Sequence, residues 1–152
     1  MLQLNLPSYE YKLKENSGKL QIFDPIRKKY IILTPEEWVR QHVIHLLNNV
    51  LGYPASRTNV EGGLSYNKKL KRTDILVYSD EMSPLVLVEC KAPDVAINQK
   101  VIDQLTVYNS RLNTPLLIST NGMQTYAILC KKGDNAQMLQ QIPTYQDLKQ
   151  ML

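Results

Sequence analysis

The chain has 152 residues, of which 43% are hydrophobic and 21% are charged. A chain of this length buries about 68 to 70% of its unfolded surface, enough for a sheet with helices packed on it, so we expect one domain over residues 1–152. The net charge of +4 and the isoelectric point near 9.0 permit a polyanionic partner without identifying one.

Residues 1–13 mix Gln, Asn, Pro and Lys with apolar residues, so they lack the apolar core of a secretory signal peptide. No apolar run approaches the roughly 20 residues that span a bilayer. We therefore expect a cytoplasmic protein with no membrane partner. The two cysteines, Cys90 and Cys130, show neither metal-ligand spacing nor a disulfide framework, and we interpret both as reduced packing residues.

Residues 1–33 are expected to form an extension that precedes the core. Two strand-like segments, Leu20–Phe23 and Tyr30–Leu33, surround Asp24-Pro25 and predict a β-hairpin. The first helix is expected to start after Thr34, because this residue is a good N-cap and a proline at the first helical position follows it.

Strands and helices alternate through the rest of the chain. Residues 34–130 have the predicted order α-β-β-β-α-β with an extra edge strand, and residues 131–152 are expected to form a closing helix or an ordered end segment. This order predicts an α/β (α+β) fold with a central mixed sheet flanked by helices. The segments after the first helix are an extended stretch at 55–61, strands at Arg72–Tyr78 and Pro84–Lys91, a helix at about Asn98–Leu112, and strands at Pro115–Ser119 and Gln124–Leu129.

The two central strands bring acids and an amine together. They are joined by a polar turn at residues 79–83, and in a symmetric hairpin around that turn Asp74 lies opposite Glu89. Directly opposed Cβ atoms lie about 4.5 to 5.5 Å apart, so the two carboxylates repel each other unless a cation lies between them. Alternation along the strand puts Lys91 on the face of Glu89, with Cys90 on the other face. The sequence therefore predicts a site of two carboxylates and a lysine, where a divalent cation would answer the repulsion.

Basic residues cluster in the sequence near these acids. A phosphate backbone could lie across them. A lysine cluster taken alone is more often a solvated loop, but beside paired acids the nucleic-acid interpretation is favoured. A second basic group occupies residues 27–29. The main predicted nucleic-acid-binding cluster consists of Lys68, Lys69, Lys71 and Arg72.

Asp74 followed by Glu89-x-Lys91 at the end of an apolar strand resembles the PD-(D/E)XK nuclease superfamily, which implies a restriction-endonuclease-like fold. More narrowly, the chain is similar to the N-terminal nuclease domain of type I restriction enzyme R subunits, although Thr73 stands where the superfamily name has proline. No G-x-x-x-x-G-K-[ST] phosphate loop occurs, so we expect the nuclease domain to stand alone, without the ATP-driven motor. The segments that carry the likeness are Pro35–Gln41, Leu51–Pro54, Arg72–Ile75, Val88–Pro93 and Asn121–Gly122.

The resemblance implies a Mg²⁺-dependent endodeoxyribonuclease in which Mn²⁺ substitutes for Mg²⁺. Asp74, Glu89 and the backbone carbonyl of Cys90 would hold the metal through hard oxygen ligands. Glu36 or Glu37, in the first turn of the first helix, would add a third acid. The sequence does not decide between them, because acids at a helix N-terminus are favoured by the helix dipole alone.

Three further residues receive roles from the same resemblance. Lys91 would orient the attacking water or help to deprotonate it, and would stabilise charge on the phosphorane. Gln104 and Tyr108, four positions apart on one face of the second helix, resemble an accessory motif that contacts phosphate or the lysine.

Two other functions fit parts of the sequence. One is a noncatalytic nucleic-acid-binding or assembly module of a restriction or repair complex, and the other is an unrelated α/β protein in which Glu89 and Lys91 form a strand ion pair. The complete set of two acids and a lysine favours the nuclease. The expected partners are DNA and subunits of a restriction or repair complex, and one active site per chain favours a homodimer for cutting both strands. The choice of DNA over RNA and the specificity of cleavage stay open at this point.

Overall fold

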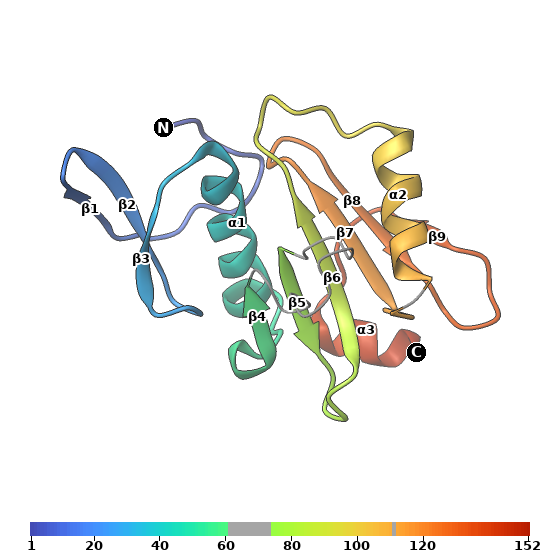
Figure 1. The fold of residues 1–152 in the computed structure, drawn as a ribbon. Coiled ribbons are helices and arrows are strands. Elements are labelled where there is room, and N and C mark those ends of the chain that lie inside the picture. Colours follow the sequence, from blue (N-terminus) through green and yellow to red (C-terminus); the bar gives the residue numbers. More distant parts are fainter. Residues whose placement is uncertain (61–73, 111) are drawn as a thin grey trace.

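The structure, a computed structural model of the chain, describes residues 1–60, 74–110 and 112–152. A small N-terminal sheet lies beside a larger sheet, with helix α1 between them (Figure 1). This is the mixed α/β architecture expected from the order of elements. Among the described residues, no helix is both long and apolar enough to cross a membrane.

The N-terminal sheet has three antiparallel strands in the order β1-β2-β3. They are β1 (Leu13–Asn16), β2 (Lys19–Asp24) and β3 (Lys29–Ile32). The predicted hairpin is present as β2 and β3. Strand β1 is an addition to the prediction, because its four residues are all exposed and show no apolar alternation.

Helix α1 spans Pro35–His45 and begins where the sequence predicts. The Thr34 hydroxyl accepts a hydrogen bond from the backbone N–H of Glu37 at 3.0 Å, which satisfies one of the free donors of the first turn. A π-helical turn continues α1 to Val50. The helix is then terminated at Gly52, whose φ of +83° lies in the left-handed region that glycine adopts without strain.

The larger sheet has six strands in the order β4-β5-β6-β7-β8-β9. Among the strands of the described residues, only β6 and β7 are parallel neighbours, and α2 lies in the crossover between them. The extended stretch predicted from residue 55 begins instead with a 3-10 turn, so β4 is short, and β9 is a further addition. The elements are β4 (Thr58–Val60), β5 (Ile75–Tyr78), β6 (Pro84–Cys90), α2 (Gln99–Asn109), β7 (Leu116–Thr120), β8 (Thr125–Leu129), β9 (Gln137–Leu139) and α3 (Tyr145–Met151).

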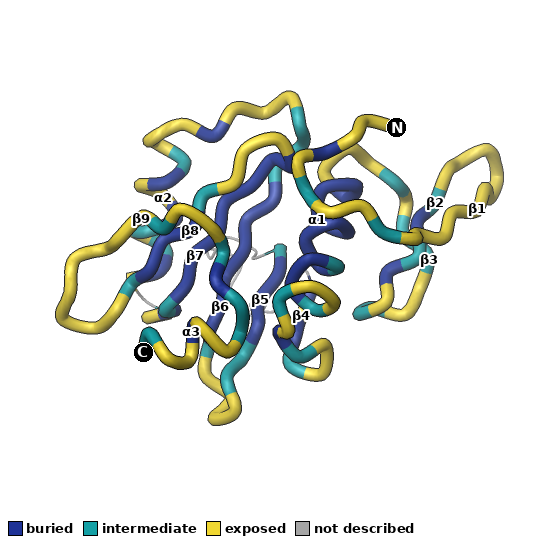
Figure 2. The backbone as a smooth tube through the Cα atoms, turned by 180° about the vertical axis from the view of Figure 1, so that it is seen from behind, coloured by how far each residue is buried: buried dark blue, intermediate teal, exposed yellow. Residues whose placement is uncertain are grey.

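Two apolar clusters cover opposite faces of the larger sheet. Alternate residues of β6 divide between them, since Val86 and Val88 pack with α1 whereas Leu87 packs with α2. Figure 2 shows the central strands buried and much of the N-terminal sheet exposed. A one-residue slip of β6 would move its whole apolar pattern to the wrong faces, so this packing holds the end of β6 in place.

The β5–β6 ladder has the predicted register. Ile75 pairs with Val88 and Val77 pairs with Val86, and a bulge follows Val77. Strand β5 starts one residue after Asp74, which lies at a bend. The register therefore brings Asp74 to the end of β6 but leaves it outside the ladder.

Candidate active site

Asp74 is held at the start of β5 by two short hydrogen bonds. Its Oδ1 accepts from Nη2 of Arg40 on α1 at 2.6 Å, and its Oδ2 accepts from the backbone N–H of Cys90 at 2.6 Å. The Asp74 side chain is 17% exposed. Burial raises the pKa of this carboxyl, and the two hydrogen bonds offset only part of that effect.

Glu89 and Lys91 form an ion pair at the end of β6. Glu89 Oε1 lies 2.7 Å from Lys91 Nζ, as expected for side chains that share a face of the strand. The backbone N–H of Lys91 donates to the carbonyl of Thr120 on β7 at 2.8 Å, which extends the sheet pairing to this residue. The hydrogen bond that Lys91 donates to Glu89 raises the pKa of Lys91 despite partial burial, so its amine is protonated at neutral pH.

Three acids act on Lys91 from three different elements. The charges of Glu89, Asp74 and Glu36 all raise its pKa, and the charge of Glu36 also raises the pKa of Asp74. The first turn of α1, the start of β5 and the end of β6 meet at the same end of the sheet (Figure 1). We call Glu36, Asp74, Glu89 and Lys91 the acid–lysine cluster. In this arrangement Lys91 and Arg40 supply the positive charge that the facing carboxylates were expected to require.

The two glutamates in the first turn of α1 have different surroundings. Glu37 is 6% exposed and pairs with Arg40 at 2.7 Å and with Arg27 at 3.0 Å. Glu36 is 47% exposed and pairs with Arg40 at 3.0 Å. Glu36 is the more exposed of the two, and its charge raises the pKa of Asp74. Both observations favour Glu36 as the third acid of the predicted site.

A buried polar network connects this region to the N-terminal sheet. Arg27 Nε lies 2.7 Å from Asp24 Oδ2, and Gln41 Nε2 donates to the carboxylates of Asp24 and Glu37 at 2.9 and 3.0 Å. Burial lowers the pKa of Arg40, but its hydrogen bond and ion pairs with the surrounding carboxylates outweigh burial and raise it. The network therefore fixes the first turn of α1 against β2 on one side and β5 on the other.

Arg40 is the residue at this site that sequence reasoning missed. It pairs with Glu36, Glu37 and Asp74. Its spacing of three and four positions from the two glutamates on one helix was a usable signal. Its contact with Asp74, 34 residues away, depends on how α1 packs against β5.

Gln104 and Tyr108 lie on α2, which packs on the opposite face of the sheet from α1. Gln104 is exposed, and Tyr108 packs partly buried against the apolar cluster beneath α2. Within the described part of the chain, Gln104 makes no hydrogen bond to the acid–lysine cluster. Their accessory role stays a prediction.

The basic clusters have different outcomes. Lys28, just before β3, and Lys29, its first residue, are exposed, whereas Arg27 is engaged by Asp24 and Glu37. The predicted nucleic-acid-binding residues Lys68, Lys69, Lys71 and Arg72 lie outside the described residues.

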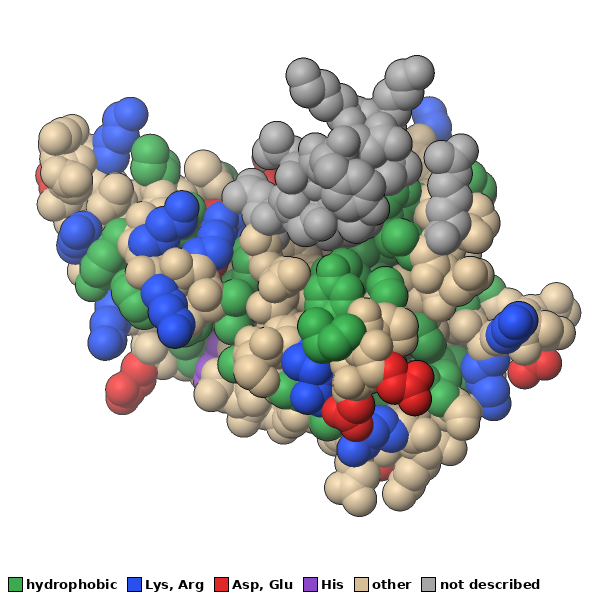
Figure 3. Space-filling model, turned by 60° about the horizontal axis from the view of Figure 1, so that its bottom comes forward, with side chains coloured by type: hydrophobic (Ala, Val, Ile, Leu, Met, Phe, Trp, Pro, Cys, Tyr) green, Lys and Arg blue, Asp and Glu red, His purple; other side chains and the backbone are tan. Residues whose placement is uncertain are grey.

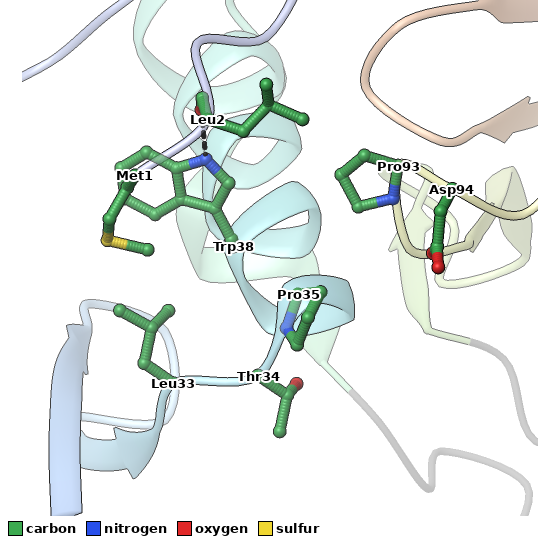
Figure 4. Close-up of a pocket in the computed structure, with 8 residues that line it drawn as sticks. All are labelled: Met1, Leu2, Leu33, Thr34, Pro35, Trp38, Pro93 and Asp94. Carbon is green, nitrogen blue, oxygen red and sulfur yellow. Dashed lines mark hydrogen bonds between the residues drawn. The ribbon is translucent and has the colours of Figure 1, made fainter.

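An apolar pocket of about 520 Å³ opens beside the first turn of α1 (Figure 4). Trp38 Nε1 donates to the carbonyl of Leu2 at 2.8 Å and so ties the N-terminal segment to α1. Pro35 and Pro93 line the pocket, and each lies within two residues of a member of the acid–lysine cluster. Asp94 is the charged side chain in the lining, and its negative charge disfavours phosphate there.

The ligand chemistry of the cluster suits Mg²⁺. This ion takes hard oxygen ligands and is commonly held by one or two carboxylates together with water. Asp74, Glu89 and Glu36 offer carboxylates, and Cys90 offers a backbone carbonyl. As the side chains lie, no three Asp, Glu, His or Cys side chains among the described residues are grouped to hold a metal ion. Arg40 contacts Asp74 Oδ1, so a metal ion would have to share or take over that contact.

Comparison with known proteins identifies a family and a similar solved structure. The profile of the family described as Type I restriction enzyme R protein N terminus (HSDR_N) matches residues 35–143. A solved fragment assigned to an HsdR subunit of a type I restriction enzyme from Vibrio vulnificus YJ016 aligns over 78% of this chain, with a TM-score of 0.56 and 19% identity. The alignment covers 25% of that solved chain, so the present chain spans about a quarter of its length. No curated protein matches the chain.

The matched stretch contains every member of the acid–lysine cluster. It runs from the first residue of α1 through the six-stranded sheet to the segment before α3, and it leaves out the N-terminal sheet. Since the match covers more than half of the sequence, this chain belongs to the family of type I restriction enzyme R protein N-terminal domains.

Proposed function

We propose that the chain is a metal-dependent nuclease domain of the restriction-endonuclease-like fold that hydrolyses DNA phosphodiester bonds. The observation that carries the proposal is the meeting of three acids and two basic residues at one end of the sheet. Arg40 contacts both Glu36 and Asp74, and Asp74 accepts from the Cys90 N–H next to the Glu89–Lys91 ion pair. A module that only binds DNA gains nothing from several carboxylates beside a phosphate, because like charges repel. Carboxylates become useful there when a metal ion lies between them and the phosphate.

Asp74, Glu89, the Cys90 carbonyl and Glu36 would hold Mg²⁺, or Mn²⁺ in its place. When bound, the ion supplies polarisation of the scissile phosphate and a lower pKa for the attacking water. Arg40 and the Cys90 N–H orient the Asp74 carboxylate from two sides at 2.6 Å. The ion would share Asp74 Oδ1 with Arg40 or displace it, while the Cys90 N–H keeps the carboxylate in place.

Lys91 would act on the charge that develops in the transition state. Its ammonium group is held 2.7 Å from Glu89 and is protonated, so it is suited to orienting water and stabilising a negative phosphorane oxygen. Groups oriented in this way typically contribute about 10²- to 10³-fold to the rate. Gln104 and Tyr108 are accessory candidates for contacts to phosphate from α2.

A cleavage assay tests the proposal. Purified protein, freed of contaminating nucleases, is incubated with plasmid, linear, branched and single-stranded DNA in Mg²⁺, Mn²⁺ or EDTA. We expect the protein to cleave at least one substrate, and this cleavage should require a metal ion. It should be lost in Glu89→Gln, which keeps the size of the side chain. The matched control is Glu81→Gln in the exposed β5–β6 turn, which should cut like the wild type. Cleavage by Glu89→Gln at the wild-type rate would overturn the site assignment.

One observation favours a second candidate, a noncatalytic module of a restriction or repair complex. Both oxygens of Asp74 are engaged by protein donors, an arrangement that also stabilises the fold without any reaction. A wild-type protein that binds DNA yet cuts none of the substrates with either metal would select this candidate. If both strands of a duplex are cut, one active site per chain calls for two copies acting together.

A further inference from the structure

The N-terminal sheet has one buried and one exposed face. Directly paired residues of antiparallel strands share a face. Ile22 of β2 pairs with Leu13 and Ile31, and it is fully buried in the cluster that includes α1. On the other face Phe23 pairs with Tyr30. The aromatic pair therefore points away from the helix that supports the sheet.

The exposed face also gathers Lys14 of β1, Lys19 of β2 and Lys12, which directly precedes β1. A hydrogen bond of 2.9 Å from the Phe23 N–H to the Lys12 carbonyl sets Lys12 beside Phe23, while Lys14 pairs with Gln21 and Lys19 with Asn16. We call Lys12, Lys14, Lys19, Phe23 and Tyr30 the aromatic–lysine face. Figure 3 shows Lys and Arg side chains gathered with hydrophobic ones over the N-terminal sheet, at the left of the view.

The acids of these strands lie on the opposite face. Glu15 pairs with Leu20, and Asp24 is buried and engaged by Arg27. The charged strand residues of the exposed face are therefore lysines, and Lys29, which pairs with Asp24, lies on the opposite face together with the acids. A second copy of the chain would present the same positive charge, so self-association through this face is disfavoured.

The two rings are placed for contact with a planar ligand. Phe23 and Tyr30 pack edge to face with centroids 5.3 Å apart, and Lys14 Nζ lies 4.4 Å from the Tyr30 ring centroid. Both rings are partly exposed, and the two apolar clusters described for the interior include neither. Beside them Ile32 is 48% exposed. Rings that the core does not use are available to a partner.

We propose that the aromatic–lysine face binds single-stranded DNA, with Phe23 and Tyr30 stacking on unpaired bases and the lysines contacting phosphates. Proteins that bind single strands combine aromatic platforms with a positive surface in this way. The bases of a duplex are stacked on one another and cannot reach the rings, and an acidic peptide would use the lysines without the rings. The choice of DNA over RNA rests on the proposed nuclease function.

The face is attached to the helix that carries part of the acid–lysine cluster. Strand β3 ends at Ile32, and α1, with Glu36 in its first turn, begins three residues later. Arg27 ties the sheet to α1 through contacts of 2.7 Å to Asp24 and 3.0 Å to Glu37. A single DNA strand bound to the N-terminal sheet would therefore be held in a fixed position relative to α1.

Fluorescence anisotropy of labelled oligothymidylate tests the proposal. The strand is about 20 nucleotides long, enough to cover a site of roughly 4 to 16 nucleotides. The full chain is titrated in EDTA at several salt concentrations, so binding is measured without cleavage. A duplex and an oligouridylate of the same length serve as comparison ligands.

Tyr30→Leu removes the ring and keeps an apolar side chain. We expect it to raise the Kd for oligothymidylate about fivefold or more, whereas Tyr30→Phe, which can still stack, should stay within about twofold of the wild type. Wild-type affinity in Tyr30→Leu would overturn the stacking role. Melting temperatures of the variants show whether each is folded.

A lysine triple tests the phosphate contacts and does not touch the rings. Changing Lys12, Lys14 and Lys19 to Gln should reduce the slope of log K against log salt by about 2, since each contact to a single strand contributes about 0.7. The matched control changes Lys131, Lys132 and Lys149 to Gln. These three are also exposed, and Lys149 Nζ lies 4.4 Å from the Tyr145 centroid, as Lys14 Nζ does from Tyr30. Equal loss of affinity in the two triples would overturn the proposal.

The comparison ligands and the cleavage assay separate the remaining outcomes. Equal affinity for duplex and single strand would overturn single-strand binding, and tighter binding of oligouridylate would overturn the assignment to DNA. A protein that never cuts DNA but loses single-strand binding in Tyr30→Leu supports this proposal and rejects the nuclease. If the wild type cuts DNA and Tyr30→Leu binds single-stranded DNA as tightly as the wild type, the nuclease is supported and the present proposal is rejected.

Discussion

Asp24 and Asp74 are aspartates at opposite ends of one polar network, and their surroundings differ. Asp24, at the end of β2, accepts hydrogen bonds from the backbone N–H groups of Ile26 and Arg27, from the Arg27 side chain and from Gln41. Burial acts to raise its pKa, but these donors outweigh burial and hold the pKa of Asp24 below its ordinary value.

Asp74, at the start of β5, has fewer donors. It accepts from Arg40 and from the Cys90 N–H, and its pKa is raised because burial prevails over these two contacts. The number of donors thus separates an acid that holds the fold from one whose negative charge is incompletely stabilised. An incompletely stabilised carboxylate gains most from a bound cation. Glu37 and Glu36 on α1 also differ in their donors, since Glu37 accepts from Arg27, Arg40 and Gln41 and Glu36 accepts from Arg40.

The largest expected effect on stability comes from changing Asp24, the aspartate with the larger number of hydrogen-bond donors. Asp24→Asn leaves Arg27 without its nearest carboxylate and should lower the free energy of unfolding by about 3 kcal/mol, the lower end of the range for breaking a buried ion pair. Urea denaturation measures this. Asp103→Asn, on the exposed face of α2, is the control and should stay within about 0.5 kcal/mol of the wild type. A small effect of Asp24→Asn would remove the contrast between the two aspartates.

Lys91→Ala tests the acid–lysine cluster around Asp74 through its effect on DNA cleavage. It should lower the cleavage rate about 10²- to 10³-fold, because the role proposed for Lys91 is mainly in the transition state. DNA affinity should stay within a few-fold, since Lys91 would make one phosphate contact of many. Single-turnover cleavage and equilibrium binding separate the two effects, with Lys132→Ala as the control. A variant that cuts as fast as the wild type would show that Lys91 takes no part in the chemistry.

Lowering the pH should change the contributions of the two aspartates to the free energy of unfolding in opposite directions. The folded-state pKa of Asp24 lies below its unfolded value of 3.8, so its stabilising contribution is present above pH 3.8 and is lost as the pH falls towards the folded pKa. Asp74 has a raised folded pKa and contributes stability as the pH falls towards 3.8. Each effect is at most about 1.4 kcal/mol per pH unit.

Urea unfolding across the acid range measures these slopes. Asp24→Asn should show a shallower loss of stability below pH 3.8, and Asp74→Asn a steeper loss above it. Identical slopes in both variants would mean that the two carboxyls titrate alike.

Glu36→Gln has the smallest expected effect on stability. Its ion pair with Arg40 is 47% exposed on the Glu36 side, so the loss should be below about 1 kcal/mol. Glu37→Gln, at a side chain that is 6% exposed, should cost more. Metal-dependent cleavage should show the opposite ranking once each rate loss is compared with the loss of stability. Glu36→Gln should lower the cleavage rate more than its small loss of stability explains, because Glu36 lies in the acid–lysine cluster. Thermal denaturation and cleavage rates of the two variants test both rankings.

The features that sequence analysis predicted well depend on local patterns. The Thr34 cap, the Ile75–Val88 register and the shared face of Glu89 and Lys91 follow from neighbouring residues or from one hairpin. Alternation of polar and apolar residues is enough to place them.

The features that it missed depend on tertiary packing or on exposed strands. Arg40 meets Asp74 across 34 residues, and the choice between Glu36 and Glu37 depends on Arg27, which comes from the turn between β2 and β3. All four residues of strand β1 are exposed, so its side chains carry no burial pattern. No periodicity in the sequence encodes such contacts.

The central claim, that Asp74 is an acid available to a divalent cation, is tested most directly by the melting temperature of the wild type and of Asp74→Asn in increasing Mg²⁺ or Mn²⁺. A metal that binds the folded state stabilises it by about 2.7 kcal/mol at a concentration of 100 Kd. The wild type should therefore melt at higher temperature as metal is added. Asp74→Asn should show no metal-dependent shift. Equal metal-induced shifts in the two proteins would contradict the account.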